Sequence, residues 1–156
     1  MKLYLKQKIF SWLDRFTAKD ADGNDCYTVE GKLAFGKQLT IYDGRGSHVA
    51  FVRQRFMPFL PRFDVEIGGQ WVCTVQREMT LFSQHYTIEG LDWWLSGDFI
   101  AHEYSMTGPD GTVMDMRRAL FTWGDSYELD IHDPGNALLC LAIAIAVDAC
   151  IAVRRR

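Results

Sequence analysis

The sequence predicts a mainly β protein with an antiparallel sheet and one long buried helix at its C-terminus. Short segments rich in Val, Ile, Thr and aromatic residues recur between turn signals, as in antiparallel β proteins. The clearest signals are pairs that end in glycine, which allow the positive φ of tight hairpins: Asp22-Gly23, Asp43-Gly44, Gly68-Gly69 and Asp110-Gly111. The C-terminal stretch from Ala137 to Val153 is apolar except for Asp148, and is far longer than a strand of ~5–6 residues.

Composition limits the chain to one globular domain with a substantial core. It has 156 residues, of which 48% are hydrophobic and 24% charged. The net charge of −3 excludes the broad basic field of a general nucleic-acid binder, so no nucleic-acid partner is expected. Four cysteines occur without a C-x-x-C pair, which predicts reduced packing residues: Cys26, Cys73, Cys140 and Cys150.

The N-terminus predicts a cytoplasmic protein, with peripheral contact to a membrane if it binds lipid. Residues 1–8 interleave charged and apolar side chains and lack the uninterrupted apolar stretch of a secretory signal. A reducing compartment agrees with free thiols.

The strands are predicted to form at least four hairpins. Leu39–Tyr42 precedes the Asp43-Gly44 turn and His48–Val52 follows it, which illustrates the pattern. Residues 57–61 contain Pro58 and Pro61 and are predicted to be a connection outside the sheet ladder.

An internal echo predicts two similar halves, about residues 1–80 and 81–132, followed by an axial helix over 137–153. Three segments reappear in the same order: Tyr27–Gly31 as Tyr86–Gly90, Arg53-Gln54-Arg55 as Arg117-Arg118, and Phe63–Ile67 as Tyr127–Ile131. Coincidence among strands built from few residue types is the alternative, because five-residue matches of this kind arise easily.

The C-terminal run is predicted to be a helix enclosed by protein. Asp133 before Pro134 is a helix start signal. A buried strand is the competing interpretation, because residues 141–147 alternate with period two, but the length and alanine content favour a helix. No polar stripe is present, so the helix must be surrounded by lipid or by a β-barrel. Its length of ~25 Å is short for a membrane core of ~30 Å, and Asp148 and three terminal arginines disfavour insertion.

No catalytic or metal-binding signature is found, and no cofactor is expected. The four histidines, His48, His85, His102 and His132, lack metal-ligand spacing. Residues 20–25 lack the glycine position of a calcium loop, and a hairpin turn explains them better. Asp64 with Glu66, and Glu128 with Asp130, lie two residues apart on one strand face, a spacing that suits acid–base chemistry but is equally typical of a solvated face.

Two groups of residues are candidate binding sites. Arginines at strand ends, Arg53, Arg55, Arg117 and Arg118, are candidates for binding phosphate or anionic lipid headgroups. The alternative is that they only solubilise the sheet ends. Of the neighbouring indoles Trp93 and Trp94, one is expected in the core and the other is a candidate contact residue.

The chain as a whole resembles the LURP-one-related family, within the wider tubby C-terminal-like and phospholipid-scramblase-like group. The resemblance rests on ordered segments: Leu5–Ser11, Tyr27–Gly31, Leu39–Gly44, Tyr86–Gly90, Gly97–Phe99, Asp125–Leu129 and Leu141–Asp148. It implies a closed antiparallel β-barrel of about twelve strands around a buried hydrophobic C-terminal α-helix. Tubby-like members bind phosphoinositides and scramblase-like members act at membranes. Lipid scrambling is not carried over, because this chain has no palmitoylated cysteine run and no calcium loop.

These observations favour a non-enzymatic binding module that recognises anionic phospholipid headgroups or a protein partner. The alternative is a small-molecule-binding or catalytic barrel that uses Asp64, Glu66 or the tryptophans at one mouth. Fold resemblance alone does not decide between them.

Overall fold

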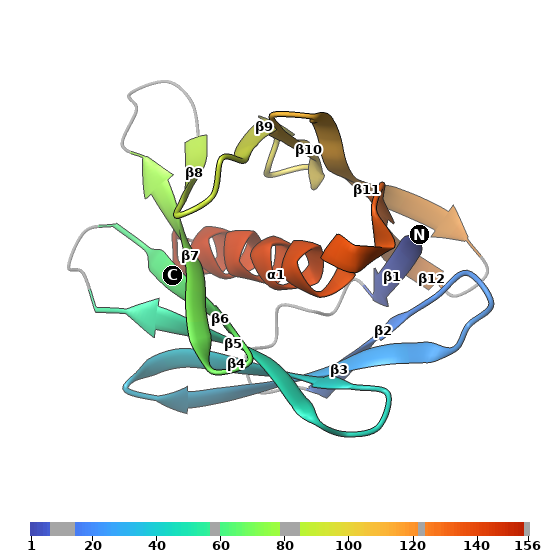
Figure 1. Ribbon diagram of the computed structural model, residues 1–156, viewed down its shortest axis with the longest axis horizontal. Helices are drawn as coiled ribbons and strands as arrows, with labels where there is room; N and C mark the ends of the chain where they lie inside the picture. The colour runs from blue at the N-terminus through green and yellow to red at the C-terminus, as the bar shows by residue number, and fades with distance from the viewer. Residues whose placement is uncertain (7–14, 57–59, 79–84, 122–123, 155–156) are drawn as a thin grey trace.

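A computed structural model of the chain describes residues 1–6, 15–56, 60–78, 85–121 and 124–154 (Figure 1). Within these residues, twelve strands wrap around one α-helix. The elements are β1 (Lys2–Lys6), β2 (Arg15–Lys19), β3 (Asp25–Ala34), β4 (Gly36–Asp43), β5 (His48–Arg55), β6 (Arg62–Ile67), β7 (Gln70–Glu78), β8 (His85–Glu89), β9 (Trp94–Asp98), β10 (Glu103–Gly108), β11 (Gly111–Phe121), β12 (Gly124–Ile131) and α1 (Ala137–Arg154).

The sheet is a meander whose ends meet to make a nearly closed barrel. Consecutive strands pair antiparallel from β1 to β8 and from β9 to β12, and β1 pairs with β12 from Lys2↔Asp130 to Lys6↔Ser126. The remaining seam lies between β8 and β9, which are in contact but are not hydrogen-bonded in register. The expectation of a mainly β antiparallel barrel of about twelve strands is therefore confirmed.

The four turns expected from their glycines all connect paired strands. In the β2–β3 hairpin the Asp20 carboxylate accepts hydrogen bonds from the Asp22 and Asn24 amides, both at 2.9 Å. In the β4–β5 hairpin Asp43 accepts in the same way from Arg45 and Ser47. Such side-chain-to-backbone bonds favour tight turns, and residues 20–25 are a hairpin, as expected. Of the predicted 57–61 connection, Leu60 and Pro61 precede β6, and residues 57–59 lie outside the described part of the chain.

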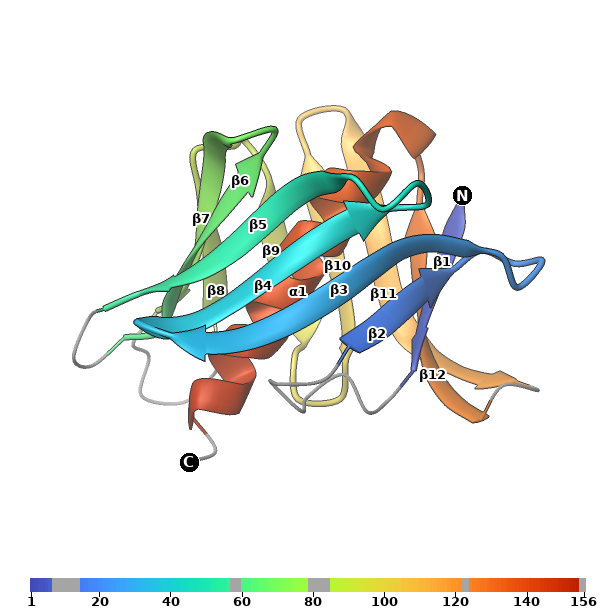
Figure 2. The ribbon, with the colours of Figure 1, turned by 90° about the horizontal axis from the view of Figure 1, so that it is seen from below.

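Helix α1 lies inside the barrel and provides its core (Figure 2). The Asp133 carboxylate accepts a 2.9 Å hydrogen bond from the Gly135 amide and caps a short 3-10 turn, Pro134–Asn136, that leads into Ala137. The predicted start signal therefore acts one turn before the α-helix itself. Every residue from 140 to 150 is buried, because the wall surrounds the helix on all sides.

The helix also has the length and composition of a membrane span. Within the 20-residue segment Pro134–Val153, an 18-residue stretch has a mean hydropathy of 2.3, and 72% of that stretch is buried inside the barrel. In this structure it packs against β5, β6, β7 and β12. Its apolar character is thus accounted for by contacts with protein.

One polar contact joins the helix to the wall. The Asp148 carboxylate on α1 lies 3.1 Å from His102 Nε2, and both side chains are less than a tenth exposed. His102 has a positive φ of 59° in the β9–β10 connection, a conformation that histidine adopts more readily than most residues. Its ring packs on Tyr127 with centroids 4.6 Å apart. Asp148, which interrupts the apolar run, therefore forms a buried contact between the helix and the barrel wall.

The cysteines are free, as expected. Burial raises the pKa of the Cys73 and Cys140 thiols to about 12. Thiols with such a pKa carry almost no reactive thiolate at neutral pH, so both are packing residues.

The predicted division into two halves remains a prediction. Arg53 opposes Asp64 across β5 and β6, and Arg117 opposes Glu128 across β11 and β12. These strand pairs are six places apart in the meander. Tyr27 and Tyr86 both face the core, but they lie on β3 and β8, five places apart.

Candidate functional site

The two ends of the barrel are formed by different elements. One end carries the tight hairpin turns, including Asp43–Ser47 between β4 and β5. At the other end lie the β3–β4 connection, the end of β5 and the C-terminus of α1 (Figure 2). Cys150 fixes the helix end there, because its Sγ lies 3.7 Å from the Pro61 carbonyl oxygen, just before β6 begins.

The structure places the four candidate arginines in two separate pairs. Arg53 and Arg55 lie on β5, and Arg117 and Arg118 lie on β11, six strands away in a ring of twelve. All four are exposed. Because the pairs lie on opposite sides of the barrel, they form no single cationic patch.

Within each pair, one arginine neutralises a buried carboxylate on the next strand. Arg55 Nε lies 2.7 Å from Asp64 Oδ2, and Asp64 also accepts a 2.6 Å hydrogen bond from Thr74. Arg117 Nε donates to Glu128 at 2.9 Å. These contacts give Arg55 and Arg117 a structural role. The spacing of residues along each strand does not predict that role.

The pKa of the Glu128 carboxyl shows the effect of its contact with Arg117. Burial by itself raises the pKa of the Glu128 carboxyl, but hydrogen bonds from Arg117 and Tyr4 outweigh it, so the net pKa is lowered. An ionised carboxylate that is 3% exposed needs such partners. Asp64 and Glu128 thus both have structural partners on neighbouring strands.

The two tryptophans divide between core and surface, as expected. Trp93 packs against the core cluster, and its indole covers Gly108 so closely that a Cβ there would lie 2.8 Å from the ring. Trp94 on β9 is 53% exposed. It lies at the hairpin end of the barrel, away from both arginine pairs.

Three apolar side chains at the other end are the feature that sequence reasoning missed. We call Leu33, Phe35 and Phe56 the aromatic rim, after its two phenylalanines. Their side chains are 63%, 99% and 95% exposed, respectively. Leu33 has the same strand parity as buried Val29, and Phe56 the same parity as buried Val52. Periodicity alone therefore assigns both to the core. In Figure 2 the β3–β4 connection lies to one side of the last turns of α1, and both side chains are exposed at this end.

The register of β4 and β5 relates the positions of the two rim phenylalanines. Gln38 pairs with Arg53, and the Lys37 amide donates to the Gln54 side chain at 3.1 Å. Continuing this register puts Phe35, in the β3–β4 turn, beside Phe56 at the end of β5. The two phenylalanines therefore form one apolar projection.

Basic residues surround this projection. Residues 31–40 and 49–56 contain four basic side chains and no acidic one: Lys32, Lys37, Arg53 and Arg55. Lys32, Arg53 and Arg55 are exposed. Lys37 is buried and Arg55 pairs with Asp64, so the positive charge beside the apolar tip comes from the exposed Lys32 and Arg53.

Comparison with known proteins agrees with this architecture. The family model described as LURP-one-related matches residues 1–148. The chain belongs to the LURP-one-related family. The expected family resemblance is thereby confirmed across nearly the whole chain.

One relative and one solved structure extend the comparison. The chain is 35% identical over 149 residues to the uncharacterized protein YxjI of Bacillus subtilis (strain 168), covering 95% of this chain and 92% of that protein. The X-ray structure of an Arabidopsis thaliana protein matches with a TM-score of 0.64 and 18% identity, covering 94% of this chain and 89% of that one. At this identity the second match shows the fold alone.

Proposed function

We propose that this LURP-one-related protein is a non-enzymatic module that docks on anionic phospholipid surfaces through its aromatic rim. The observation that carries the proposal is the near-complete exposure of Phe35 and Phe56 at neighbouring positions. Water-exposed phenylalanines gain free energy when an apolar phase covers them, at ~1.5–3 kcal/mol for full burial of each.

Charge supplies the second contribution to membrane binding. Lys32 and Arg53 flank the rim, are exposed and make no ion pair with any described residue. Each basic residue near an anionic bilayer contributes roughly 1 kcal/mol, within a Debye length of ~8 Å. Peripheral attachment usually needs two weak signals together, and this end of the barrel provides an apolar one and a cationic one.

The test is co-sedimentation of the purified protein with vesicles of phosphatidylcholine alone or with added phosphatidylserine or phosphoinositide. We expect binding to the anionic vesicles that weakens as salt is raised. Phe35→Ser/Phe56→Ser should weaken it by about tenfold or more, because each tenfold corresponds to only ~1.4 kcal/mol. Trp94→Ser is the matched control, since it removes an aromatic ring that is half exposed at the opposite end.

The contribution of positive charge to vesicle binding is tested with Lys32→Glu/Arg53→Glu, and Arg45→Glu is the control. Arg55 and Arg117 are left unchanged because each holds a buried carboxylate. Arg45 is exposed in the β4–β5 turn, at the far end. Failure of the wild type to bind anionic vesicles at low salt would overturn the proposal and leave a protein partner as the better explanation of the rim. Equal losses in the control variants would also overturn it.

A further inference from the structure

Among the hydrogen-bonded strand neighbours, pairing is shortest between β1 and β2. The described residues of these strands share one registered pair, Tyr4↔Lys19, whereas β1 with β12, β2 with β3 and β3 with β4 are paired along most of their length. Edges left unpaired in this way expose backbone groups that can receive another molecule. This opening is distinct from the seam between β8 and β9.

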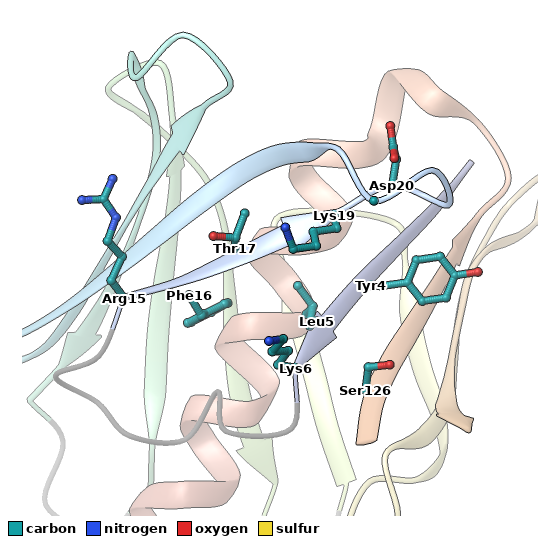
Figure 3. A pocket seen from close by; sticks show the side chains of 10 residues that line it. Tyr4, Leu5, Lys6, Arg15, Phe16, Thr17, Lys19, Asp20 and Ser126 are labelled. Carbon is teal, nitrogen blue, oxygen red and sulfur yellow. The ribbon is translucent and has the colours of Figure 1, made fainter. Parts of the chain in front are cut away.

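A pocket of about 430 Å³ occupies this opening (Figure 3). Its lining includes Leu5 and Phe16, which belong to or pack against the core, and Thr17 from the outer face of β2. Side chains from both faces of the sheet line it, so the pocket passes into the wall. Pockets of ~300–1,000 Å³ are typical for small ligands.

The polar groups in the pocket are arranged for an acidic ligand. Lys6, Arg15 and Lys19 line it against one carboxylate, Asp20. Arg15 and Lys19 already pair with Glu30 and Asp25. Lys6 is exposed and makes no ion pair with a described residue. Its ammonium group is thus available to a ligand anion.

A second, independent observation points to a ligand. Ser126 lines the pocket from β12, is 4% exposed, and its hydroxyl has no hydrogen-bond partner within the described residues. Buried hydroxyls nearly always have partners, because an unmade hydrogen bond costs free energy. A ligand oxygen in the pocket would supply the missing partner.

We propose that the β1–β2 pocket binds a small amphiphile, an apolar body carrying one acidic group. Leu5 and Phe16 cover the apolar body, Lys6 pairs with the acidic group, and the Ser126 hydroxyl hydrogen-bonds to it. The site is separate from the aromatic rim and does not depend on membrane docking. Either proposal can fail while the other stands.

The experiment is a fluorescence titration with two probes of matched shape. Anilinonaphthalene sulfonate carries an apolar body and an anion, and its uncharged parent phenylnaphthylamine carries the apolar body alone. We expect saturable binding of the sulfonate at one site, displaced by decanoate more effectively than by decanol. Titrations are repeated on Phe35→Ser/Phe56→Ser, so that dye bound at the aromatic rim is counted separately.

Two variants locate the site. Lys6→Glu should weaken sulfonate binding by about five- to tenfold and leave phenylnaphthylamine binding unchanged, because only the charge–charge contact is lost. Arg45→Glu makes the same charge change elsewhere and should have no effect. Thr17→Trp should fill the pocket and weaken both probes, with a melting curve to show that it folds. Unchanged sulfonate binding in Lys6→Glu, or equal displacement by decanoate and decanol, would overturn the proposal.

Discussion

Replacing Ala144 with Trp should leave no folded protein. Ala144 is fully buried at the middle of α1, and the residues from 140 to 150 are buried all round the helix. Protein interiors are close-packed, and overpacking in a core that can shift costs ~1–3 kcal/mol or more. Here the wall surrounds the helix, so an indole has no side on which to escape. We expect a loss beyond that range, comparable with the whole stability of ~5–15 kcal/mol.

The measurement is soluble yield followed by thermal unfolding monitored by circular dichroism. Ala152→Trp is the matched control, because the same substitution on the same helix falls where the side chain is only partly buried. A folded Ala144→Trp protein that melts within a few degrees of the wild type would show that the barrel is not filled by the helix.

Removing the Asp148 carboxylate should have the second-largest effect. Asp148→Ala removes the partner that His102 has on the helix, and the loss of a buried hydrogen-bond partner costs ~1–3 kcal/mol. Urea unfolding at neutral pH measures the loss. Asp148→Asn, which keeps the shape of the side chain, should lose less. A change below ~1 kcal/mol in Asp148→Ala would contradict a structural role for the pair.

The same residue predicts a pH dependence with a definite sign. Burial raises the pKa of Asp148, and the hydrogen bond and charge of His102 oppose this only in part. A carboxyl whose pKa is higher when folded stabilises most below its unfolded value of ~3.9, and this contribution is lost as pH rises through the folded pKa. Wild type should therefore lose stability relative to Asp148→Asn as pH rises through that window. The opposite trend in paired urea titrations would show that His102 dominates the carboxyl.

Local features of the sequence were enough to predict the helix and the turns. The helix was predicted over 137–153 and runs from Ala137 to Arg154. Its apolar length, the cap at Asp133 and the four glycine turns are all read from neighbouring residues. Backbone conformation at such places depends on residues a few positions apart, so the sequence carries it directly. The separation of Trp93 from Trp94 follows in the same way from alternation along a strand.

The roles of the candidate site residues depend on contacts with residues on neighbouring strands, which the local sequence does not show. Nothing near Arg55 or Arg117 in sequence shows that each neutralises a buried carboxylate on a neighbouring strand, because only strand register brings Asp64 and Glu128 within reach. The candidate arginines were therefore correctly expected at the surface, but two of them have structural partners.

The aromatic rim shows the same limit more clearly. Leu33 and Phe56 have the parity of core residues, and alternation alone assigns them to the inside. By itself the sequence determined which side chains face inward, because side chains alternate along every strand. Only the tertiary structure decided whether other residues pack against these inward-facing side chains. The β3–β4 connection lies to one side of the last turns of α1 (Figure 2), and these side chains are exposed there although their parity is that of core residues.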